Sequence, residues 1–278
     1  MSSDLQMDDM NDIITELHDM RYLNWTKTRK FSCTAGSFLK AYDDTGKKKK
    51  YYKLSDYDQV NGIVGHECVN EIVVQRLLQK LDIEHLEYTL IHAAVRTDGK
   101  EYETYLCESE DYKKPGESKL SLEDYYAMEK EKDESPLEFC NRKGWDTYIY
   151  EMTVIDYLVL NRDRHGANIE VLRNPKKKAD RLAPLFDHGL SLVCRCHTLQ
   201  ELEHYDVLED KRIQSFIGTS SALQNVRIVP KSFLKRLPKL TENDIADIFE
   251  GLEDIIGEAY INKMHDMIWK RWCSLDSI

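Results

Sequence analysis

The sequence lacks the features of a membrane-bound or exported protein. No apolar run in its 278 residues approaches the ~20 residues that a membrane-spanning helix needs. The N-terminal stretch MSSDLQMDDMNDIITELHDM is acidic, whereas an export signal begins with a basic segment followed by an apolar one. Internal repeats and low-complexity segments are also missing. We therefore expect a globular, cytoplasmic protein without a membrane-bound part.

Paired cysteines are missing as well. The seven cysteines are odd in number and scattered along the chain, at positions 33, 68, 107, 140, 194, 196 and 273. In a chain of this length they are typical of reduced thiols rather than of a disulfide framework. The segment CRCH at 194–197 has no second cysteine pair at a distance, which structural zinc sites usually have. The sequence does not favour a zinc site.

An excess of basic residues is the third absence. The formal net charge is −11, and a protein that binds nucleic acids generally needs a basic surface to displace counterions from phosphates. The one basic run, Lys47–Lys50, follows the turn-forming residues DDTG, and we interpret it as a solvated hairpin turn. Direct binding of nucleic acid is therefore not expected.

The N-terminal part of the chain contains the signals of a small β-rich lobe. Apolar residues with helical spacing predict an amphipathic helix over residues 7–20. Two hairpins are predicted next, one turning at DDTG (43–46) and one at Asp98-Gly99. Between them, ECVNEIVVQRLLQKL (67–81) predicts a helix with its apolar stripe at positions 69, 72, 73, 77, 78 and 81. The polar stretch SEDYKKPGESK, with Pro115 and Gly116, is typical of a linker.

After this linker the sequence becomes helical. Ser121 and Asp124 resemble the capping box of a helix, and residues 145–160 predict a helix that is buried on one face. Two short strands, IEVL (169–172) and LAPLFD (182–187), surround the turn NPKKKAD. The last part, from 240 onward, predicts two helices, the first capped by Thr241 or Asn243 and the second separated from it at Gly257.

Six sequence features, which follow one another along the chain, match the needs of phosphoryl transfer from a nucleoside triphosphate. The first hairpin carries small residues (Ser32, Thr34, Ala35, Gly36 and Ser37) that let backbone N–H groups approach phosphates, and Lys53 follows on its second strand. The next helix bears Glu67 and Glu71, either of which could hold that lysine. Further along, NRDRHGAN supplies Asp163 to orient an acceptor hydroxyl and take its proton.

The remaining two parts are oxygen ligands for a metal ion. Asn168 follows Asp163 by five residues, and Asp187 ends the second strand of the hairpin that begins after Asn168. A two-stranded hairpin returns Asp187 beside Asn168, and Mg²⁺ prefers carboxylate and carbonyl oxygens. Gly189 gives the chain the conformational freedom to turn away after Asp187.

The segments DYLVLNRDRHGANIEV and LFDHGLSLV resemble the HipA-like protein kinases, which are bacterial toxin-type Ser/Thr kinases, and the resemblance covers roughly residues 30–270. It implies ATP and Mg²⁺ as cofactors, with Asp163 as the catalytic acid/base, His165 as a brace of its loop, and Asn168 and Asp187 as Mg²⁺ ligands. NEIVVQRLLQKLDI is similar to the family's Asn-Glu helix, which implies Glu71 as the partner of Lys53, with Glu67 as the alternative. Lys53 would reach the phosphates.

The resemblance also implies the nucleotide contacts. CESEDY lies where the family has its hinge, which would give Glu108 and Glu110 backbone contacts to adenine and Asp111 a contact to ribose. Ser32, Gly36 and Ser37 would form the phosphate loop, in which Ser32 or Ser37 is the candidate for autophosphorylation. SCTAGSF is only loosely similar to the family's loop.

We predict an α+β, two-lobed kinase-like fold with ATP bound between the lobes. Residues 1–24 form an N-terminal helix or extension, 25–108 the β-rich N-lobe, 109–120 the hinge, and 121–278 the larger helical C-lobe. The partner is a protein substrate that the sequence does not identify. The family's toxin kinases have a longer N-terminal segment, so an antitoxin-like regulator has no support in the residues themselves.

Three other functions are compatible with parts of the pattern. A phosphatidylinositol-type lipid kinase also carries D-R-H-x-x-N, although such enzymes need basic surfaces for anionic head groups and this chain is acidic. A pseudokinase or binding module would hold a nucleotide or a partner without turnover. A purely structural protein would have no reason to combine Lys53, Asp163, Asn168 and Asp187.

Overall fold

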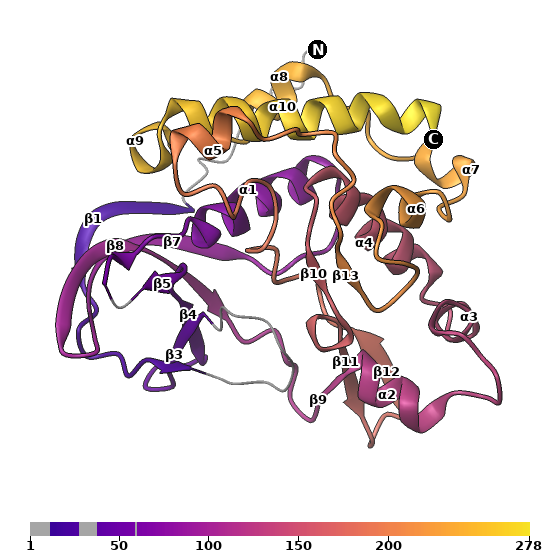
Figure 1. The fold of residues 1–278 in the computed structure, drawn as a ribbon. Helices are drawn as coiled ribbons and strands as arrows, with labels where there is room; N and C mark the ends of the chain where they lie inside the picture. Colours follow the sequence, from indigo (N-terminus) through magenta and orange to yellow (C-terminus); the bar gives the residue numbers. More distant parts are fainter. Residues whose placement is uncertain (1–11, 28–37, 59) are drawn as a thin grey trace, which may run out of the picture. The chain divides into compact units, whose positions relative to one another are not determined.

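The structure is a computed structural model that describes residues 12–27, 38–58 and 60–278 (Figure 1). The chain divides into two compact units. The first consists of Met1–Val64 and Glu87–Asp111, and the second of Gly65–Leu86 and Tyr112–Ile278. Sheet dominates the first and helix the second, so the predicted α+β class is confirmed. Within the described residues, no helix has the length and apolar character needed to cross a membrane.

A six-stranded sheet in the order β1-β7-β8-β4-β3-β2 forms most of the first unit. Its strands are β1 (Ile13–Asp19), β2 (Thr26–Lys27), β3 (Leu39–Asp43), β4 (Lys50–Lys53), β7 (Tyr88–Thr97) and β8 (Lys100–Glu110). Two shorter strands, β5 (Tyr57–Asp58) and β6 (Gly62–Ile63), pair with each other. Both predicted hairpins are confirmed as the antiparallel pairs β3–β4 and β7–β8. Asp98 and Gly99 have φ values of 49° and 76°, as a tight two-residue hairpin turn requires.

The core of the first unit lies on one face of this sheet because apolar residues alternate along its strands. Leu39 and Ala41 of β3 are buried while Lys40 between them is exposed. The buried cluster consists of Met20, Leu23, Leu39, Ala41, Tyr52, Leu54, Ile91, Ala93, Val95 and Leu106.

The predicted N-terminal helix is wrong for the described residues. Ile13–Asp19 form strand β1, which pairs in parallel with β7, and residues 1–11 lie outside the described part. The edge of β7 offers a row of backbone hydrogen-bonding groups, and Ile13, Ile14 and Thr15 are β-branched residues that favour strands. Tertiary pairing therefore overrides the helical spacing, and Leu17, expected on the buried stripe, is 54% exposed.

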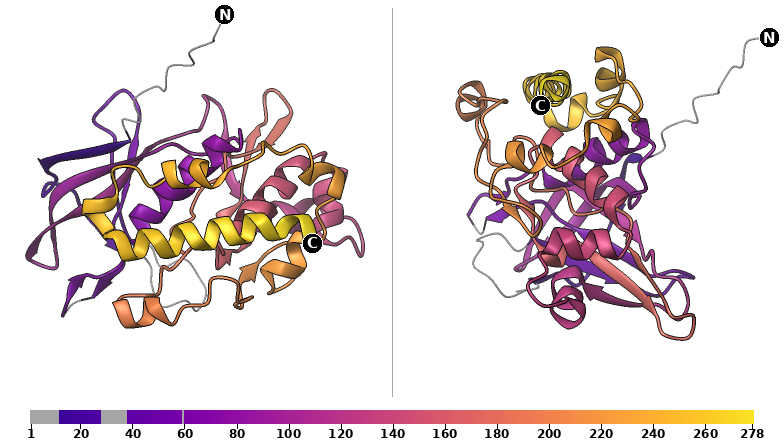
Figure 2. Two further views of the ribbon diagram at one scale, coloured as in Figure 1. Left: turned by 90° about the horizontal axis from the view of Figure 1, so that it is seen from above. Right: turned by 90° about the vertical axis from the view of Figure 1, so that its right-hand side faces the viewer.

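The second unit is mainly helical. Its helices are α1 (Glu67–Lys80), α2 (Leu122–Glu129), α3 (Pro136–Arg142), α4 (Asp146–Leu158), α5 (Leu199–Glu203), α6 (Ala222–Val226), α7 (Lys231–Leu234), α8 (Glu242–Asp247), α9 (Glu253–Ile256) and α10 (Glu258–Ser274), with short 3-10 turns at Gly166–Asn168 and Leu275–Ser277. Ser121 caps α2 by accepting the Asp124 N–H, and Thr241 caps α8, as predicted. Figure 2 shows α10 along its whole length in one view and almost end-on in the other.

Helix α1 is confirmed with its predicted apolar stripe, but it clusters with the second unit rather than with the β-rich part that was predicted to contain it. Ile72, Val73 and Leu77 have no exposed surface. Arg76 is also buried, and its Nη1 donates to the backbone oxygens of Ile248 and Glu250 at 2.9 and 2.7 Å. These contacts join α1 to the connection between α8 and α9.

Five strands complete the second unit. β9 (Ser118–Ser121), β11 (Glu170–Asn174) and β12 (Ala179–Leu182) form an antiparallel sheet in the order β12-β11-β9. β10 (Asp163–Arg164) and β13 (Gln214–Ser215) form a parallel pair. Residues 109–120, which were predicted as a hinge, contain the end of β8 and most of β9. The strand predicted at 182–187 is observed earlier in the chain, as β12 at Ala179–Leu182.

Candidate active site

The backbone of Asp163 is fixed on both sides by asparagine side chains. Its N–H donates to Oδ1 of Asn161 at 3.1 Å, and its carbonyl oxygen accepts from Nδ2 of Asn168 at 2.7 Å. Helix α4 ends just before this loop, at Leu158, where the chain turns through Leu160 with φ 49°. Asp163 thus lies on a short strand whose peptide groups are held by its neighbours, and its side chain is 19% exposed.

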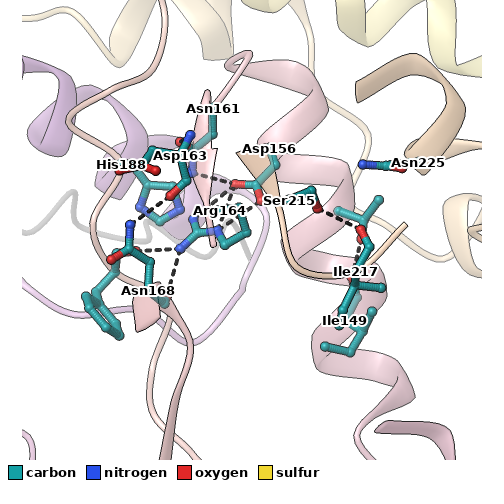
Figure 3. Close-up of polar contacts among 12 residues, drawn as sticks. Ile149, Asp156, Asn161, Asp163, Arg164, Asn168, His188, Ser215, Ile217 and Asn225 are labelled. Atoms are coloured by element: carbon teal, nitrogen blue, oxygen red, sulfur yellow. Dashed lines mark hydrogen bonds and ion pairs between the residues drawn. The ribbon is translucent and has the colours of Figure 1, made fainter. Parts of the chain in front are cut away.

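A buried ion pair supports this loop from α4. The Arg164 guanidinium donates to both carboxylate oxygens of Asp156, with Nε–Oδ2 at 2.9 Å and Nη2–Oδ1 at 3.0 Å. Nδ2 of Asn161 donates to the same Asp156 at 2.9 Å (Figure 3). The two charged side chains are only 1% and 9% exposed. Burial disfavours the charged guanidinium, but the Asp156 carboxylate outweighs that cost and raises the pKa of Arg164.

Arg164 also joins the loop to the segment that carries Asp187. Its Nη1 donates to the backbone oxygens of Asn168, at 3.1 Å, and of Phe186, at 2.8 Å. The hairpin β11–β12 brings these segments together from the other side, since the Ala183 N–H donates to the Glu170 oxygen at 2.8 Å. The predicted return of the chain from Asn168 to Asp187 is therefore present, although Asp187 follows β12 by several residues instead of ending a strand.

The turn after Phe186 differs from the predicted one. The left-handed residue is Asp187, with φ 60°, whereas freedom of the backbone had been expected from Gly189. A non-glycine residue rarely adopts this conformation, although Asp and Asn tolerate it better than most, and such strain is concentrated at functional sites. The conformation is held by hydrogen bonds from α1.

Two adjacent residues of α1 bind the backbone that follows Asp187. The Glu71 carboxylate accepts the N–H groups of His188 at 2.8 Å and Gly189 at 3.0 Å. The Asn70 amide donates to the backbone oxygens of Gly189 at 2.8 Å and Ser191 at 3.0 Å. Glu71 is 1% exposed and Asn70 is fully buried. The helix therefore determines where the chain runs after the candidate metal ligand.

His165 lies against the loop that carries Asp163, and its predicted bracing role stays a prediction. Its Nδ1 accepts the Ala167 N–H at 3.2 Å, so a neutral ring carries its proton on Nε2. That Nε2 lies 3.6 Å from Oδ1 of Asp163. The next residue, Gly166, packs so closely on Glu123 of α2 that a methyl group there would lie 2.5 Å from the Glu123 Cβ.

Asn168 and Asp187 fit the requirements of a Mg²⁺ site. The Asn168 amide donates through Nδ2 to the Asp163 carbonyl oxygen, so Oδ1 is the atom of this side chain that could bind a metal ion. An amide oxygen and a carboxylate are the hard donors that Mg²⁺ prefers, and Mg²⁺ takes its other ligands from water and phosphates. In the described part of the chain, no group of three or more His, Cys, Asp or Glu side chains could hold a metal ion. A site at Asn168 and Asp187 would thus rely on these two donors.

Three predicted residues of the first unit lie on two paired strands, Lys53 on β4 and Glu108 and Glu110 on β8. Lys53 ends β4 opposite Cys107 of β8, is 8% exposed, and has its Nζ 4.6 Å from the centre of the Phe38 ring. Lysine is seldom buried to this degree without a specific role or partner. The burial distinguishes Lys53 from an ordinary solvated lysine of a strand.

Glu108 and Glu110 belong to β8 rather than to a free linker. Lys50 Nζ donates to Glu108 Oε1 at 2.7 Å, and Lys48 Nζ forms an ion pair with Glu110 at 2.5 Å. The Asp111 N–H donates to the Lys49 oxygen at 3.0 Å. The Glu108 and Glu110 carboxylates thus pair with Lys50 of β4 and with Lys48 of the turn before it. The predicted backbone contacts of Glu108 and Glu110 with adenine stay a prediction. Ser32, Gly36 and Ser37 lie outside the described residues.

Comparisons of the sequence with protein-family models and with curated proteins find no match. Comparison with solved structures does. The Helicobacter pylori proinflammatory kinase CtkA matches with a TM-score of 0.59 at 16% identity, covering 94% of this chain and 96% of that one. HipA of Shewanella oneidensis MR-1, solved with HipB and its operator DNA, matches with a TM-score of 0.52 at 14% identity, covering 91% of this chain and 68% of that one.

The chain has the fold of the HipA-like kinases. The two-unit α+β architecture predicted from the sequence agrees with this fold. Within it, Asp163, His165, Asn168, Asp187 and Glu71 belong to the second unit, and Lys53, Glu108, Glu110 and Asp111 to the first. The predicted pairing of Lys53 with Glu71, or with Glu67, stays a prediction.

The sequence did not predict the roles of four residues that support the loops of this HipA-like fold: Asn70, Asp156, Asn161 and Arg164. A signal was present for Asp156, because it is the one charged residue in the apolar run MTVIDYLVL. A charge inside such a run indicates a buried partner. Asn70 directly precedes Glu71, but its contact with Gly189 joins residues far apart in the sequence and has no local signal.

Proposed function

We propose that the protein is an ATP- and Mg²⁺-dependent kinase that transfers the γ-phosphoryl group to a Ser or Thr hydroxyl of a protein. The observation that carries this proposal is the arrangement around Arg164. One guanidinium group binds Asp156, the backbone of Asn168 and the backbone of Phe186, and so holds the Asp163 loop and the Asp187 segment together. A kinase needs its acid/base and its metal ligands in a fixed relation of this kind.

Asp163 acts as the base for the acceptor hydroxyl. The acceptor oxygen forms a bond to the γ-phosphorus while the bond from that phosphorus to the β–γ bridging oxygen breaks, so that ADP leaves. The hydroxyl proton goes to the Asp163 carboxylate. Because the Asp163 peptide groups are bound by Asn161 and Asn168, the carboxylate needs little reorganisation during the reaction.

The other residues bind and orient the nucleotide. Asn168 and Asp187 hold Mg²⁺, which neutralises the negative charge that develops on the phosphates. Lys53 binds the phosphates, and Glu71 keeps the segment after Asp187 in place. Ser32, Gly36 and Ser37 are assigned to the phosphate loop, the backbone at Glu108 and Glu110 to adenine, and Asp111 to ribose.

Incubation with γ-labelled ATP and Mg²⁺, followed by mass spectrometry, tests the proposal. The wild type should label Ser or Thr residues, in itself or in added protein, and Asp163→Ala should lower the rate by about 10²–10⁴. Asp187→Ala should abolish metal-dependent nucleotide binding. Gln200→Ala, an exposed substitution on α5, is the control and should keep the wild-type rate.

Two results would contradict a protein kinase. Tight ATP binding without any label would indicate a nucleotide-binding pseudokinase. Label found only on phosphatidylinositol in an added vesicle of that lipid would indicate a lipid kinase. Transfer that persists in Asp163→Ala would refute the role of Asp163 while leaving kinase activity in place.

A further inference from the structure

Strand β13 places a side chain beside Asp163 that the proposed roles do not use. In the parallel pair β10–β13, Asp163 is opposite Gln214 and Arg164 is opposite Ser215. The Gln214 N–H donates to the Arg162 oxygen, and the Phe216 N–H donates to the Arg164 oxygen, both at 2.9 Å. Residues opposite each other in a ladder project from the same face, and successive residues alternate between faces.

The burial of these four residues agrees with that alternation. Arg164 is 1% exposed, and Ser215 donates from its Oγ to the Ile217 oxygen at 2.6 Å, so this pair faces the interior. Gln214 is exposed, and the side chain of Asp163 is partly exposed. Asp163 and Gln214 therefore share the outer face, on strands that are about 4.8 Å apart.

The position of Gln214 is fixed from both sides of β13. One side is bonded to β10, and on the other the Ile213 N–H donates to the Ser220 oxygen at 3.0 Å. Arg212 and Ser221 form a further bridge between the same two segments. The backbone of Gln214 is thus held in a stable relation to the catalytic loop.

We propose that Gln214 is a specificity-determining residue that binds the peptide group next to the acceptor hydroxyl; this inference rests on the proposed kinase function. A carboxamide offers one oxygen acceptor and two N–H donors, so it can bond the C=O and the N–H of a peptide group together. It is also uncharged, so it can accept from an N–H and donate to a C=O without a preference for charged neighbours of the acceptor. Its chemistry selects a polypeptide acceptor.

Kinetics with Gln214→Ala, Gln214→Glu and the control Gln200→Ala test the proposal. The substrate is a library of Ser- and Thr-containing peptides with ATP and Mg²⁺, and phosphorylation of the protein itself is followed in parallel. For Gln214→Ala, kcat/KM should fall about 3- to 10-fold, the loss of one or two hydrogen bonds, mainly through a higher peptide KM. The dissociation constant for ATP should stay unchanged.

Gln214→Glu gives a second readout that a merely structural role would not change. The carboxylate keeps oxygen acceptors but has no N–H donor, and its charge should shift the preferred library peptides toward those with Lys or Arg next to the acceptor. Gln200→Ala should match the wild type in both measurements.

The failures of the two proposals are distinguishable. If the wild type transfers phosphate to no peptide and not to itself, the kinase proposal is refuted and this inference with it. If the wild type transfers phosphate and Gln214→Ala has an unchanged peptide KM and Gln214→Glu an unchanged preference among the library peptides, this inference alone is refuted. A parallel loss of ATP affinity in Gln214→Ala would also refute it, because the residue would then support the fold.

Discussion

Arg164 and Asp156 form a bidentate ion pair in the interior of the second unit, with Nε–Oδ2 at 2.9 Å and Nη2–Oδ1 at 3.0 Å. The same guanidinium binds the backbone of Asn168 and of Phe186. One side chain thereby links helix α4, the loop of Asp163 and the segment of Asp187. The relationship suggests that stability and activity depend on the same pair.

Asp156→Ala should strongly destabilise the protein. It leaves the Arg164 guanidinium buried without its carboxylate, and breaking a buried pair in this way costs about 3–5 kcal/mol. Urea unfolding measures the change. Lys270→Ala is the matched control, since its pair with Asp266 is nearly half exposed on both sides and should contribute less than about 1 kcal/mol. Equal losses for the two variants would contradict the structural role of Arg164.

Glu71→Gln should weaken Mg²⁺-dependent nucleotide binding. An amide oxygen can replace one acceptor, but the NH₂ group would face the other backbone N–H, of His188 or Gly189. We expect the Mg²⁺ concentration for half-maximal ATP binding to rise about 10-fold, equivalent to one charge-assisted hydrogen bond. Glu67→Gln, one turn earlier in α1, is the control. If it has the larger effect, Glu67 rather than Glu71 is the functional carboxylate of the helix.

Gly166→Ala should destabilise the loop that carries Asp163. A methyl group there would lie 2.5 Å from the Glu123 Cβ and 3.0 Å from the Phe216 ring, so the loop or α2 must move. Overpacking of this kind typically costs about 1–3 kcal/mol. The midpoint temperature of thermal unfolding and the rate of phosphoryl transfer should both decrease. At Gly46 a methyl group would meet the Lys48 oxygen at an ordinary 3.6 Å, so Gly46→Ala should be close to neutral.

Stability should decrease between pH 6.5 and pH 4 because of His66. Burial, with a smaller effect of His197, lowers the pKa of His66 to about 4, and its ring packs edge-on against Tyr260. In that pH range the unfolded chain binds the proton and the folded chain does not, so stability is present above pH 6.5 and is lost as the pH falls. The loss at pH 5 is about 2 kcal/mol.

His66→Phe keeps a ring in this position and removes the titration. Urea unfolding at pH 7 and pH 5 should therefore show a smaller decrease for the variant than for the wild type. Identical decreases for the two proteins would show that His66 does not titrate differently on unfolding.

Much of the fold follows from local sequence signals. The hairpin at Asp98-Gly99, the apolar stripe of α1 and the cap of α2 at Ser121 each depend on residues close in sequence, and each is confirmed. The prediction of an N-terminal helix was wrong because the conformation of Ile13–Asp19 is set by pairing with β7, a strand far along the chain. Helical spacing in so short a segment cannot outweigh a free sheet edge.

The candidate site shows the same limit. The residue types at Asp163, Asn168 and Asp187 predicted a catalytic acid/base and two metal ligands, and these roles stay predictions. Their supports were not predictable, since Glu71 and Asn70 bind a backbone segment more than a hundred positions away. Gln214 is likewise placed beside Asp163 only by the pairing of β10 with β13.

The course of the chain limits how this protein can be divided. Helix α1 is encoded before β7 and β8, yet it belongs to the unit that otherwise begins at Tyr112. A recombinant fragment that starts at Tyr112 would contain Asp163, Asn168 and Asp187 but not Asn70 or Glu71. The backbone after Asp187 would then lose four of its hydrogen bonds. A functional C-terminal piece therefore requires residues 65–86 to be supplied as well, either by circular permutation or as a separate peptide.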